Sequence, residues 1–438
     1  FALTLILRLW GFAQGYPGFY GHVDEIGVAA SIWNFFRAAT LQPTEFTYPA
    51  FYSYLVAAGL WLTHAMGWGP DLGRFSESLI FISYLDPGRV ALVGRVLSAV
   101  LSALVPLLTY ALGKEAFNAR VGSIAALFMA VALVPVVHAH QALPDSAMAL
   151  GAALCFYCSW RIYTHGSWRY YLLAGFVAGL VVATKYNGAF TALAIPAAHW
   201  LRSDRTLWSL LVPKLCLAIF IALLALFVGS PYLFLASDKY WALVNYQISS
   251  LDFALGERTP WWWIVRSLPQ VEWLVGGLML GGMVWSIYRR EALDWILWAA
   301  WLPSFLYIGS WTRESLHYLL HFYPLWALGA ARLLAAGGGM ELSEEEMGGF
   351  GSGRLLCIAE HLSGGIIQSG SGKTGFTTGS SRLDQNQYSG WNPAGYELVA
   401  VLPGIATKTG TRKYCTRLCG KSAGTGVITG GLGRCAGL

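Results

Sequence analysis

The chain opens with the apolar run FALTLILRLWGF (Phe1–Phe12), and the segment GYPGFYGHVDE (Gly15–Glu25) follows it closely. Such a run has the composition of part of a membrane span, which places the adjacent carboxylates Asp24 and Glu25 at the edge of a hydrocarbon core. A carboxylate beside lipid is costly unless it has a task or a partner. This pair is therefore the first candidate functional site. Because the run starts without Met, we expect a fragment or a processed start rather than a cleavable signal peptide.

Composition indicates a polytopic membrane protein. Hydrophobic residues make up 56% and charged residues 12% of the 438 residues, which is too apolar a balance for a soluble domain. The net charge is +6, but the basic residues are scattered singly between apolar runs, which argues against a nucleic-acid partner. We predict an all-α transmembrane bundle of about ten spans in a lipid bilayer. The spans are expected near residues 1–14, 89–112, 121–137, 146–163, 170–184, 187–201, 207–230, 264–288, 293–310 and 317–335.

The distribution of Lys and Arg predicts the orientation of these spans, since short cytoplasmic loops hold an excess of both. If the Asp24 loop is external, the internal loops carry Lys114 and Arg120, Arg161 and Arg169, Arg202 and Arg205, Arg289 and Arg290, and Arg332. The long segment 15–88 then lies outside. Its apolar stretch Tyr48–Leu62 is expected to form a helix in the interface, because counting it as a span would put the basic loops outside.

Two further segments differ from the spans in composition. The second external loop, 231–263, is rich in Tyr and Trp, which suits either contacts with sugar rings or an interfacial aromatic belt. Residues 336–438 are rich in Gly and Ser, so we expect a disordered tail or a stretch outside the natural reading frame. The predicted domains are therefore a transmembrane domain, 1–335, and this tail.

The predicted topology gathers acids and bases on the external face. The candidates are Asp24, Glu25, Arg89, Arg95, His138, His140, Asp145, Lys185, Arg313, Glu314 and His317. A carboxylate there could act as a general base on an acceptor hydroxyl, and Arg or Lys could stabilise the charge on a departing phosphate. The structural alternatives are a helix cap for Asp24, headgroup contacts for Arg89 and Arg95, and a polar interfacial loop rather than a metal site for the His138–Asp145 segment.

The order of these elements resembles a known family, the GT-C integral-membrane glycosyltransferases, and within it the dolichyl-phosphate-mannose protein mannosyltransferases and bacterial aminoarabinose transferases (glycosyltransferase family 39-like). The resemblance covers residues 1–335. Its motifs are Leu7-Arg-Leu-Trp10, Asp24-Glu25, Tyr48-Pro-Ala-Phe-Tyr52, Gly94-Arg-Val-Leu-Ser98, Leu107–Lys114, Val137–Asp145, Gly179–Gly188 and His317–Pro324. Two departures from the family pattern are Pro49-Ala50 in place of Pro-Pro and His317-Tyr318 in place of Arg-Tyr.

The resemblance implies an inverting transfer of mannose or another sugar from a polyprenyl-phosphate donor to a protein, glycan or lipid acceptor. The catalytic set is then Asp24, Glu25 and Asp145, with Asp24 as the base and Asp145 in support. Arg95 and Lys185 match the basic positions expected to contact the donor phosphate, and Arg89 is added from topology. His138, His140, Arg313 and His317 are further site candidates.

The expected location is the plasma (inner) membrane, with the site on the external or periplasmic face. No cofactor is expected, and a divalent metal is possible but not required. The alternative function is a transporter or a lipid flippase without transferase activity, whose coupling acids would be expected near the bilayer midplane.

Overall fold

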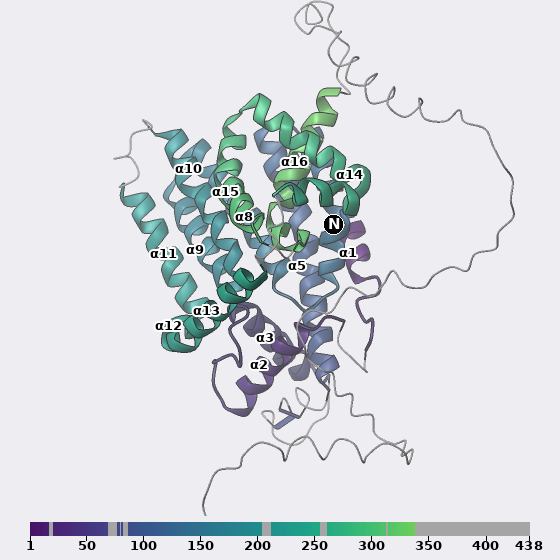
Figure 1. Cartoon of the computed structure of the whole chain (residues 1–438), viewed down its shortest axis with the longest axis vertical. Coiled ribbons are helices and arrows are strands. Elements are labelled where there is room, and N and C mark those ends of the chain that lie inside the picture. Colours follow the sequence, from purple (N-terminus) through teal and green to yellow (C-terminus); the bar gives the residue numbers. More distant parts are fainter. Residues whose placement is uncertain are drawn as a thin grey trace, which may run out of the picture. The chain divides into compact units, whose positions relative to one another are not determined.

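The computed structural model describes residues 1–16, 21–68, 77–78, 80–81, 86–203, 212–254, 261–311 and 314–337. Within these ranges every regular element is a helix, which confirms the predicted all-α class (Figure 1). The predicted tail lies outside the described residues from 338 onward, so its disorder stays a prediction. The helices are α1 (Ala2–Leu9), α2 (Glu25–Arg37), α3 (Phe51–Ala65), α5 (Pro87–Ala116), α6 (Ala119–Val131), α7 (Leu133–Ala139), α8 (Asp145–His165), α9 (Trp168–Thr184), η1 (Tyr186–Leu193), α10 (Ala194–Arg202), α11 (Pro213–Gly229), α12 (Tyr232–Leu235), α13 (Ser237–Ala254), α14 (Trp262–Arg289), α15 (Ala292–Ile308), η3 (Leu316–Phe322) and α16 (Tyr323–Gly337).

Each predicted span coincides with a helix or with two consecutive helices. Among the described residues, three helices are long and apolar enough to cross a bilayer by themselves: Gly88–Ala116, Trp262–Arg289 and Leu316–Gly337. The pair α6 and α7, bent by 53°, is a fourth candidate, and α9, α11 and α15 are apolar but shorter. The structure thus holds several membrane-crossing helices, while the count of about ten spans stays a prediction.

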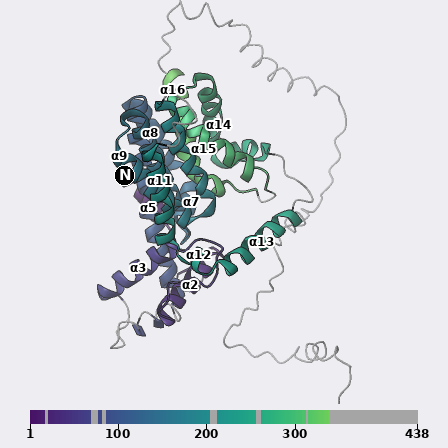
Figure 2. The same cartoon turned by 90° about the vertical axis from the view of Figure 1, so that its left-hand side faces the viewer.

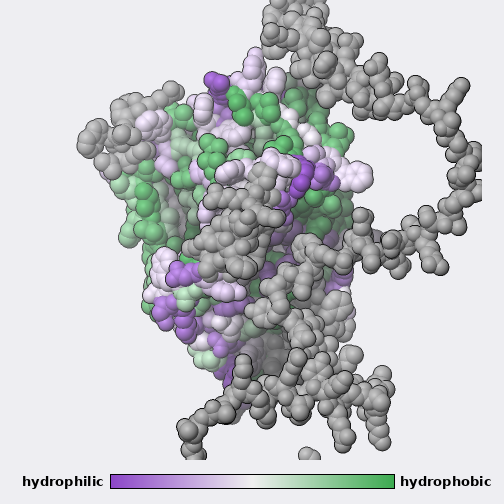
Figure 3. All heavy atoms as spheres, in the orientation of Figure 1, coloured by the Kyte–Doolittle hydropathy of each residue, from purple (hydrophilic) through white to green (hydrophobic). Residues whose placement is uncertain are grey.

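The outer surface of the bundle is apolar where lipid would lie. Along α11 the side chains of Phe220, Leu223 and Val228 are exposed, and Figure 3 shows a hydrophobic flank beside this helix. Water-facing helices of a soluble protein would carry polar side chains at such positions. The exposed apolar face and the long apolar helices together identify a multi-pass membrane protein.

The two helices of the first loop pack against one end of the bundle. Ile32 of α2, Val56 of α3 and Val90 of α5 are buried in one hydrophobic cluster. Figures 1 and 2 both place α2 and α3 at the same end as the short helix α12. The helix expected over 48–62 is present as α3, while its position in the membrane interface stays a prediction.

The break between α6 and α7 is stabilised on both sides by a buried charge. Arg8 donates hydrogen bonds to the carbonyl oxygens of Met129 and Ala130 at 2.9 and 3.0 Å, at the end of α6. Glu272 accepts from the backbone amides of Leu133 and Val134 at 2.6 and 2.8 Å, at the start of α7. These contacts satisfy backbone groups that a broken helix leaves unpaired, and they hold α7, which carries His138, in place.

Candidate active site

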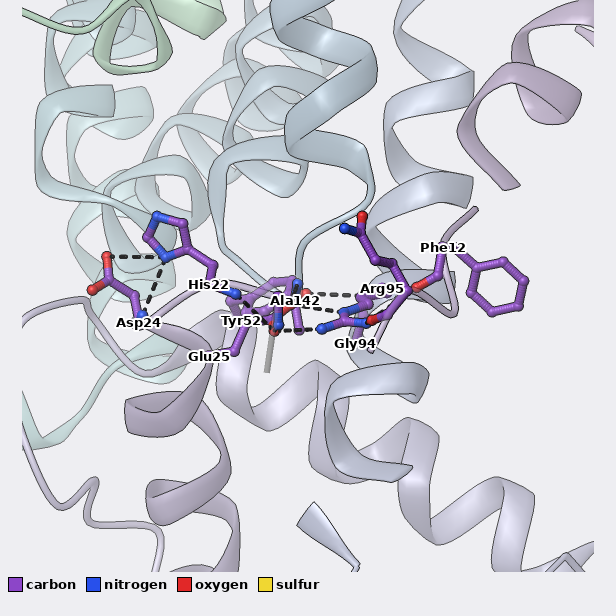
Figure 4. Close-up of polar contacts among 10 residues, drawn as sticks. Phe12, His22, Asp24, Glu25, Tyr52, Gly94, Arg95 and Ala142 are labelled. Atoms are coloured by element: carbon purple, nitrogen blue, oxygen red, sulfur yellow. Dashed lines mark hydrogen bonds and ion pairs between the residues drawn. The ribbon is translucent and has the colours of Figure 1, made fainter. Parts of the chain in front are cut away.

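Asp24 and Glu25 mark the start of α2, but their side chains have separate surroundings (Figure 4). Asp24 occupies the N-cap position and its side chain makes no capping hydrogen bond. Glu25 instead accepts hydrogen bonds from the preceding backbone, because its Oε2 lies 2.8 and 3.3 Å from the amide nitrogens of Gly21 and His22. Consecutive helical residues point about 100° apart, which separates the two carboxylates. The structural alternative of a capping role therefore fits Glu25 and leaves the Asp24 carboxylate available.

Glu25 forms a buried ion pair with Arg95 of α5. The Nε and Nη2 atoms of Arg95 donate to Oε1 and Oε2 of Glu25 at 2.9 and 2.7 Å. Arg95 also donates from Nη1 to the carbonyl oxygens of Phe12 and Gln14 at 3.3 and 2.6 Å. The amide of Ala142 adds a fourth donor to Glu25, at 2.8 Å. This network ties the first loop, α5 and the loop before α8 together.

The burial of this pair argues against the predicted phosphate contact of Arg95 and against a catalytic role for Glu25. Both side chains are at most 2% exposed, and Arg95 uses four of the five donors of a guanidinium within the protein. Burial alone would raise the pKa of Glu25, but the Arg95 and Ala142 hydrogen bonds and the Arg95 charge outweigh it and hold the pKa below its usual value. We propose a structural role for the pair.

Asp24 faces a cavity of about 480 Å³. Its side chain is 39% exposed, its Oδ2 accepts from the hydroxyl of Tyr48 at 2.7 Å, and its backbone amide donates to Nδ1 of His22 at 3.1 Å. Burial and then the nearby Asp24 carboxylate raise the pKa of Tyr48 well above its usual value, so the phenol stays a donor. A partly solvated carboxylate beside a cavity has the setting that a general base needs.

Tyr48 also connects Asp24 with the second acid and its cation. The ammonium nitrogen of Lys185 lies 5.2 Å from the ring centre of Tyr48 and 5.6 Å from that of Tyr318. Lys185 donates to Oδ1 of Asp145 at 2.7 Å. This is one of three donors that an ammonium group offers, and Oδ2 of Asp145 is buried without a partner. The cation is thus held in place with part of its hydrogen-bonding capacity unused.

Lys185 reaches this position because α9 ends directly before it. Its backbone is extended, with φ −155° and ψ 131°, and the chain continues into the 3₁₀ helix η1. Asn187 in η1 donates from Nδ2 to the carbonyl oxygen of Tyr318 at 2.6 Å. This bond links η1 to η3 and positions the Tyr318 ring beside the ammonium group.

The remaining predicted residues divide between this site and other places. His138 and His317 stack with ring centres 5.0 Å apart, and the ring centre of His317 lies 4.1 Å from that of Tyr318, so these two lie near the site. His140 instead contacts the carbonyl oxygen of Leu7 at 3.1 Å through Nε2.

Arg89 and Glu314 are not brought to Asp24 but pair elsewhere. Arg89 pairs with Asp86 at 3.0 Å and lies 5.1 Å from the Trp68 ring centre. Arg313 lies outside the described residues. Its neighbour Glu314 pairs with Arg266 at 2.8 Å.

The sequence reasoning missed the role of three polar residues. Tyr48, Tyr318 and Asn187 were noted only as parts of apolar or matching segments. The available signal was position for two of them, because Tyr318 follows His317 and Asn187 lies two residues after Lys185, each at the start of a predicted span; Tyr48 lies at the start of the predicted interfacial helix. Among the described residues no group of three or more His, Cys, Asp or Glu is arranged to hold a metal ion.

The chain is similar in sequence to one protein family and in fold to several solved structures. Residues 80–233 match the family of the dolichyl-phosphate-mannose-protein mannosyltransferases. The crystal structure of ArnT from Cupriavidus metallidurans bound to undecaprenyl phosphate is similar, with a TM-score of 0.54 and 16% sequence identity. The chain has a GT-C fold. The match with ArnT covers 84% of this chain and 63% of ArnT, so the chain spans less than two thirds of that protein.

Two further solved structures are also similar to the chain. The apo structure of the same ArnT gives a TM-score of 0.53 at 16% identity, with 84% of this chain and 63% of ArnT covered. AglB, the oligosaccharyltransferase of Archaeoglobus fulgidus, in complex with an inhibitory peptide and a dolichol-phosphate, gives 0.49 at 14% identity, with coverage of 84% and 53%. No curated protein sequence matches the chain. The predicted resemblance to GT-C glycosyltransferases is confirmed.

Proposed function

We propose that this protein is a membrane glycosyltransferase that moves a sugar from a polyprenyl-phosphate donor to an acceptor hydroxyl. The observation that carries the proposal is the Asp24 carboxylate, which faces a cavity and is joined through Tyr48 to the buried cation Lys185. A base and a phosphate-stabilising cation at one site are the two groups that this transfer requires. The match of residues 80–233 with the mannosyltransferase family supports the same reaction, with mannose as one donor sugar to test.

The reaction assigns each group a step. Asp24 accepts the proton of the acceptor hydroxyl while the acceptor oxygen attacks the anomeric carbon of the sugar. The bond between that carbon and the phosphate oxygen breaks, and polyprenyl phosphate leaves with the electron pair. Lys185 stabilises the negative charge that collects on the phosphate, and Asp145 holds the ammonium group in position beforehand. Inversion at the anomeric carbon follows from this single displacement.

The site is proposed to lie on the external face of the plasma membrane, where the positive-inside distribution puts the first loop. The acceptor is a protein, a glycan or a lipid with a free hydroxyl. No step in this scheme requires a metal ion, so we expect transfer to persist in the presence of a chelator.

Lys185→Met tests the donor side. The full chain is reconstituted in lipid vesicles with labelled polyprenyl-phosphate mannose or another hexose and a membrane extract as acceptor. Because the variant removes the charge beside the leaving phosphate, we expect the rate to fall by a factor of about 100 or more. Wild-type rates in the variant would exclude Lys185, and a folded wild-type chain that transfers no sugar from any donor would favour a transporter or flippase.

A further inference from the structure

The cavity beside Asp24 is acidic and has no cationic residue among its described lining. Its walls come from α2, from segment 43–49 and from the start of α3, and they include Asp24, Glu45, Ser31, Thr44 and Ser53. Lys185 and Asp145 do not line it. The donor phosphate is assigned to Lys185, on the far side of Tyr48, so this cavity is available for the other substrate.

Glu45 lies along the same face of α2 as Asp24. A Cβ atom at Gly27 would come within 1.8 Å of Oε1 of Glu45, so this carboxylate lies directly against the helix where a glycine leaves room. Asp24 and Gly27 are three positions apart and therefore share one face, separated by about 4.5 Å along the axis. The two carboxylates thus lie roughly one helical turn apart on one wall.

The side chain of Glu45 is exposed and has few partners within the described part of the protein. Its Oε2 accepts a long hydrogen bond of 3.4 Å from Thr47, and no ion pair involves it. A charged ligand nitrogen would gain both Coulomb energy and hydrogen bonds from this carboxylate, whereas an anionic group would be repelled by Glu45 and Asp24 together.

Ser53 supplies an independent sign that a polar ligand belongs here. Its side chain lines the cavity and is only 8% exposed. Unlike Ser31, whose hydroxyl pairs with that of Thr44 at 3.2 Å, Ser53 makes no side-chain hydrogen bond with any residue that the structure describes. A nearly buried hydroxyl without a protein partner is costly unless a ligand or water completes it.

We propose that the cavity binds the acceptor and that Glu45 selects acceptors with a positive charge about one helical turn from the nucleophilic hydroxyl. The chemical class is an amine-bearing polyol, such as an amino sugar. Anionic acceptors are excluded. This inference rests on the proposed function, since it assigns the second substrate of the same site.

Binding of three small glycosides tests the charge preference without requiring turnover. Methyl glucosaminide, methyl glucoside and methyl glucuronide present similar rings with positive, neutral and negative groups, and their affinities for the full chain in nanodiscs are measured by NMR at pH 6.5. We expect the cationic glycoside to bind about tenfold more tightly than the neutral one, and the anionic one to bind least. Glu45→Gln should reduce the tenfold advantage to about twofold, and Glu45→Asp should restore part of it.

Two control variants separate charge from shape. Ser53→Ala should weaken all three glycosides alike and leave their ratios unchanged, because it removes a neutral hydrogen bond. Glu115→Gln removes an acid near the C-terminal end of α5, where Glu115 pairs with Arg161 and does not line the cavity, and should change nothing. Thermal unfolding of each variant verifies that the fold is intact.

The inference is overturned if the anionic glycoside binds as tightly as the cationic one, if Glu45→Gln leaves the ratio unchanged, or if the folded wild type binds none of the three. Its failure can be told apart from that of the proposed function. Sugar transfer without the charge preference would count against this inference alone, whereas the preference without any transfer would count against the transferase assignment.

Discussion

Asp24 and Glu25 carry the same functional group, and their surroundings assign them different roles. Glu25 is buried and accepts five hydrogen bonds from four residues, while Asp24 keeps one hydroxyl donor and an open side. A carboxylate saturated by hydrogen bonds has no lone pair left for a substrate proton. We therefore propose that Asp24 accepts the proton of the acceptor and that Glu25 attaches the first loop to α5.

Glu25→Gln should destabilise the fold. Breaking one side of a buried ion pair leaves Arg95 with an uncompensated charge, which costs about 3 kcal/mol in the free energy of unfolding. Chemical or thermal unfolding in detergent measures this difference at pH 7. A double variant with Arg95→Met should recover part of the loss, and a stability equal to wild type would contradict the structural role.

The pH dependence of that difference has a definite sign. The pKa of Glu25 is lowered in the folded state, so its stabilising contribution is complete above the unfolded pKa of about 4.3 and is lost as the pH falls through the folded value. Wild type and Glu25→Gln should therefore converge in stability as the medium is acidified below about pH 4. A gap that widened on acidification would show that the ionised pair is not the cause.

At the scale of elements, the positions of the helices along the chain were predictable from the sequence, but the side-chain contacts between them were not. Apolar runs and the Lys and Arg between them predicted nearly every helix in the described part of the chain, including α2 and α3. The pairing of Glu25 with Arg95 was not predictable, because the two residues are 70 positions apart and several other acids and bases were equally plausible partners. The break between α6 and α7 was not predictable either, because Arg8 and Glu272, which stabilise it, lie in segments distant in sequence.

Small residues determine how closely neighbouring helices approach. Gly175 and Gly179 of α9 form a Gly-x-x-x-Gly pattern, and a Cβ at either position would lie 2.2 or 2.1 Å from a carbonyl oxygen of α11. Such contacts let two backbones pack together within a bilayer.

Gly179→Ala should weaken the packing of α9 on α11. The added methyl group would overlap the Ala222 carbonyl oxygen, so we expect a loss of about 1–3 kcal/mol, read as a lower thermal midpoint in detergent. Gly277→Ala is the matched control, because nothing lies within 4 Å of a Cβ there. Equal thermal midpoints for Gly179→Ala and Gly277→Ala would contradict a stabilising role of the close contact between α9 and α11.

At the scale of the whole molecule, the apolar flanks and the charged site serve different surroundings. Exposed Phe and Leu side chains on helices such as α11 suit lipid, whereas Asp24 and its cavity are built from α2, the first loop and α3 at one end of the bundle. A lipid-linked donor fits this division, since its polyprenyl chain can stay in the bilayer while its phosphate reaches Lys185. The membrane itself thus contributes to substrate binding.

The orientation of the chain can be tested by labelling. In a cysteine-free background, Asp238→Cys at the start of α13 should react with an impermeant maleimide added to intact cells, because the positive-inside distribution puts this segment outside. Arg169→Cys, an exposed position at the start of α9, should react only after permeabilisation. The reverse pattern would place the Asp24 site on the cytoplasmic face.

The most direct test of the central claim is the rate of sugar transfer by Asp24→Asn. The variant keeps an acceptor oxygen for the Tyr48 hydroxyl, so the thermal midpoint should match wild type, while loss of the base should reduce the transfer rate by a factor of about 100 to 10,000. A folded Asp24→Asn protein that transfers sugar at the wild-type rate would show that Asp24 is not the base.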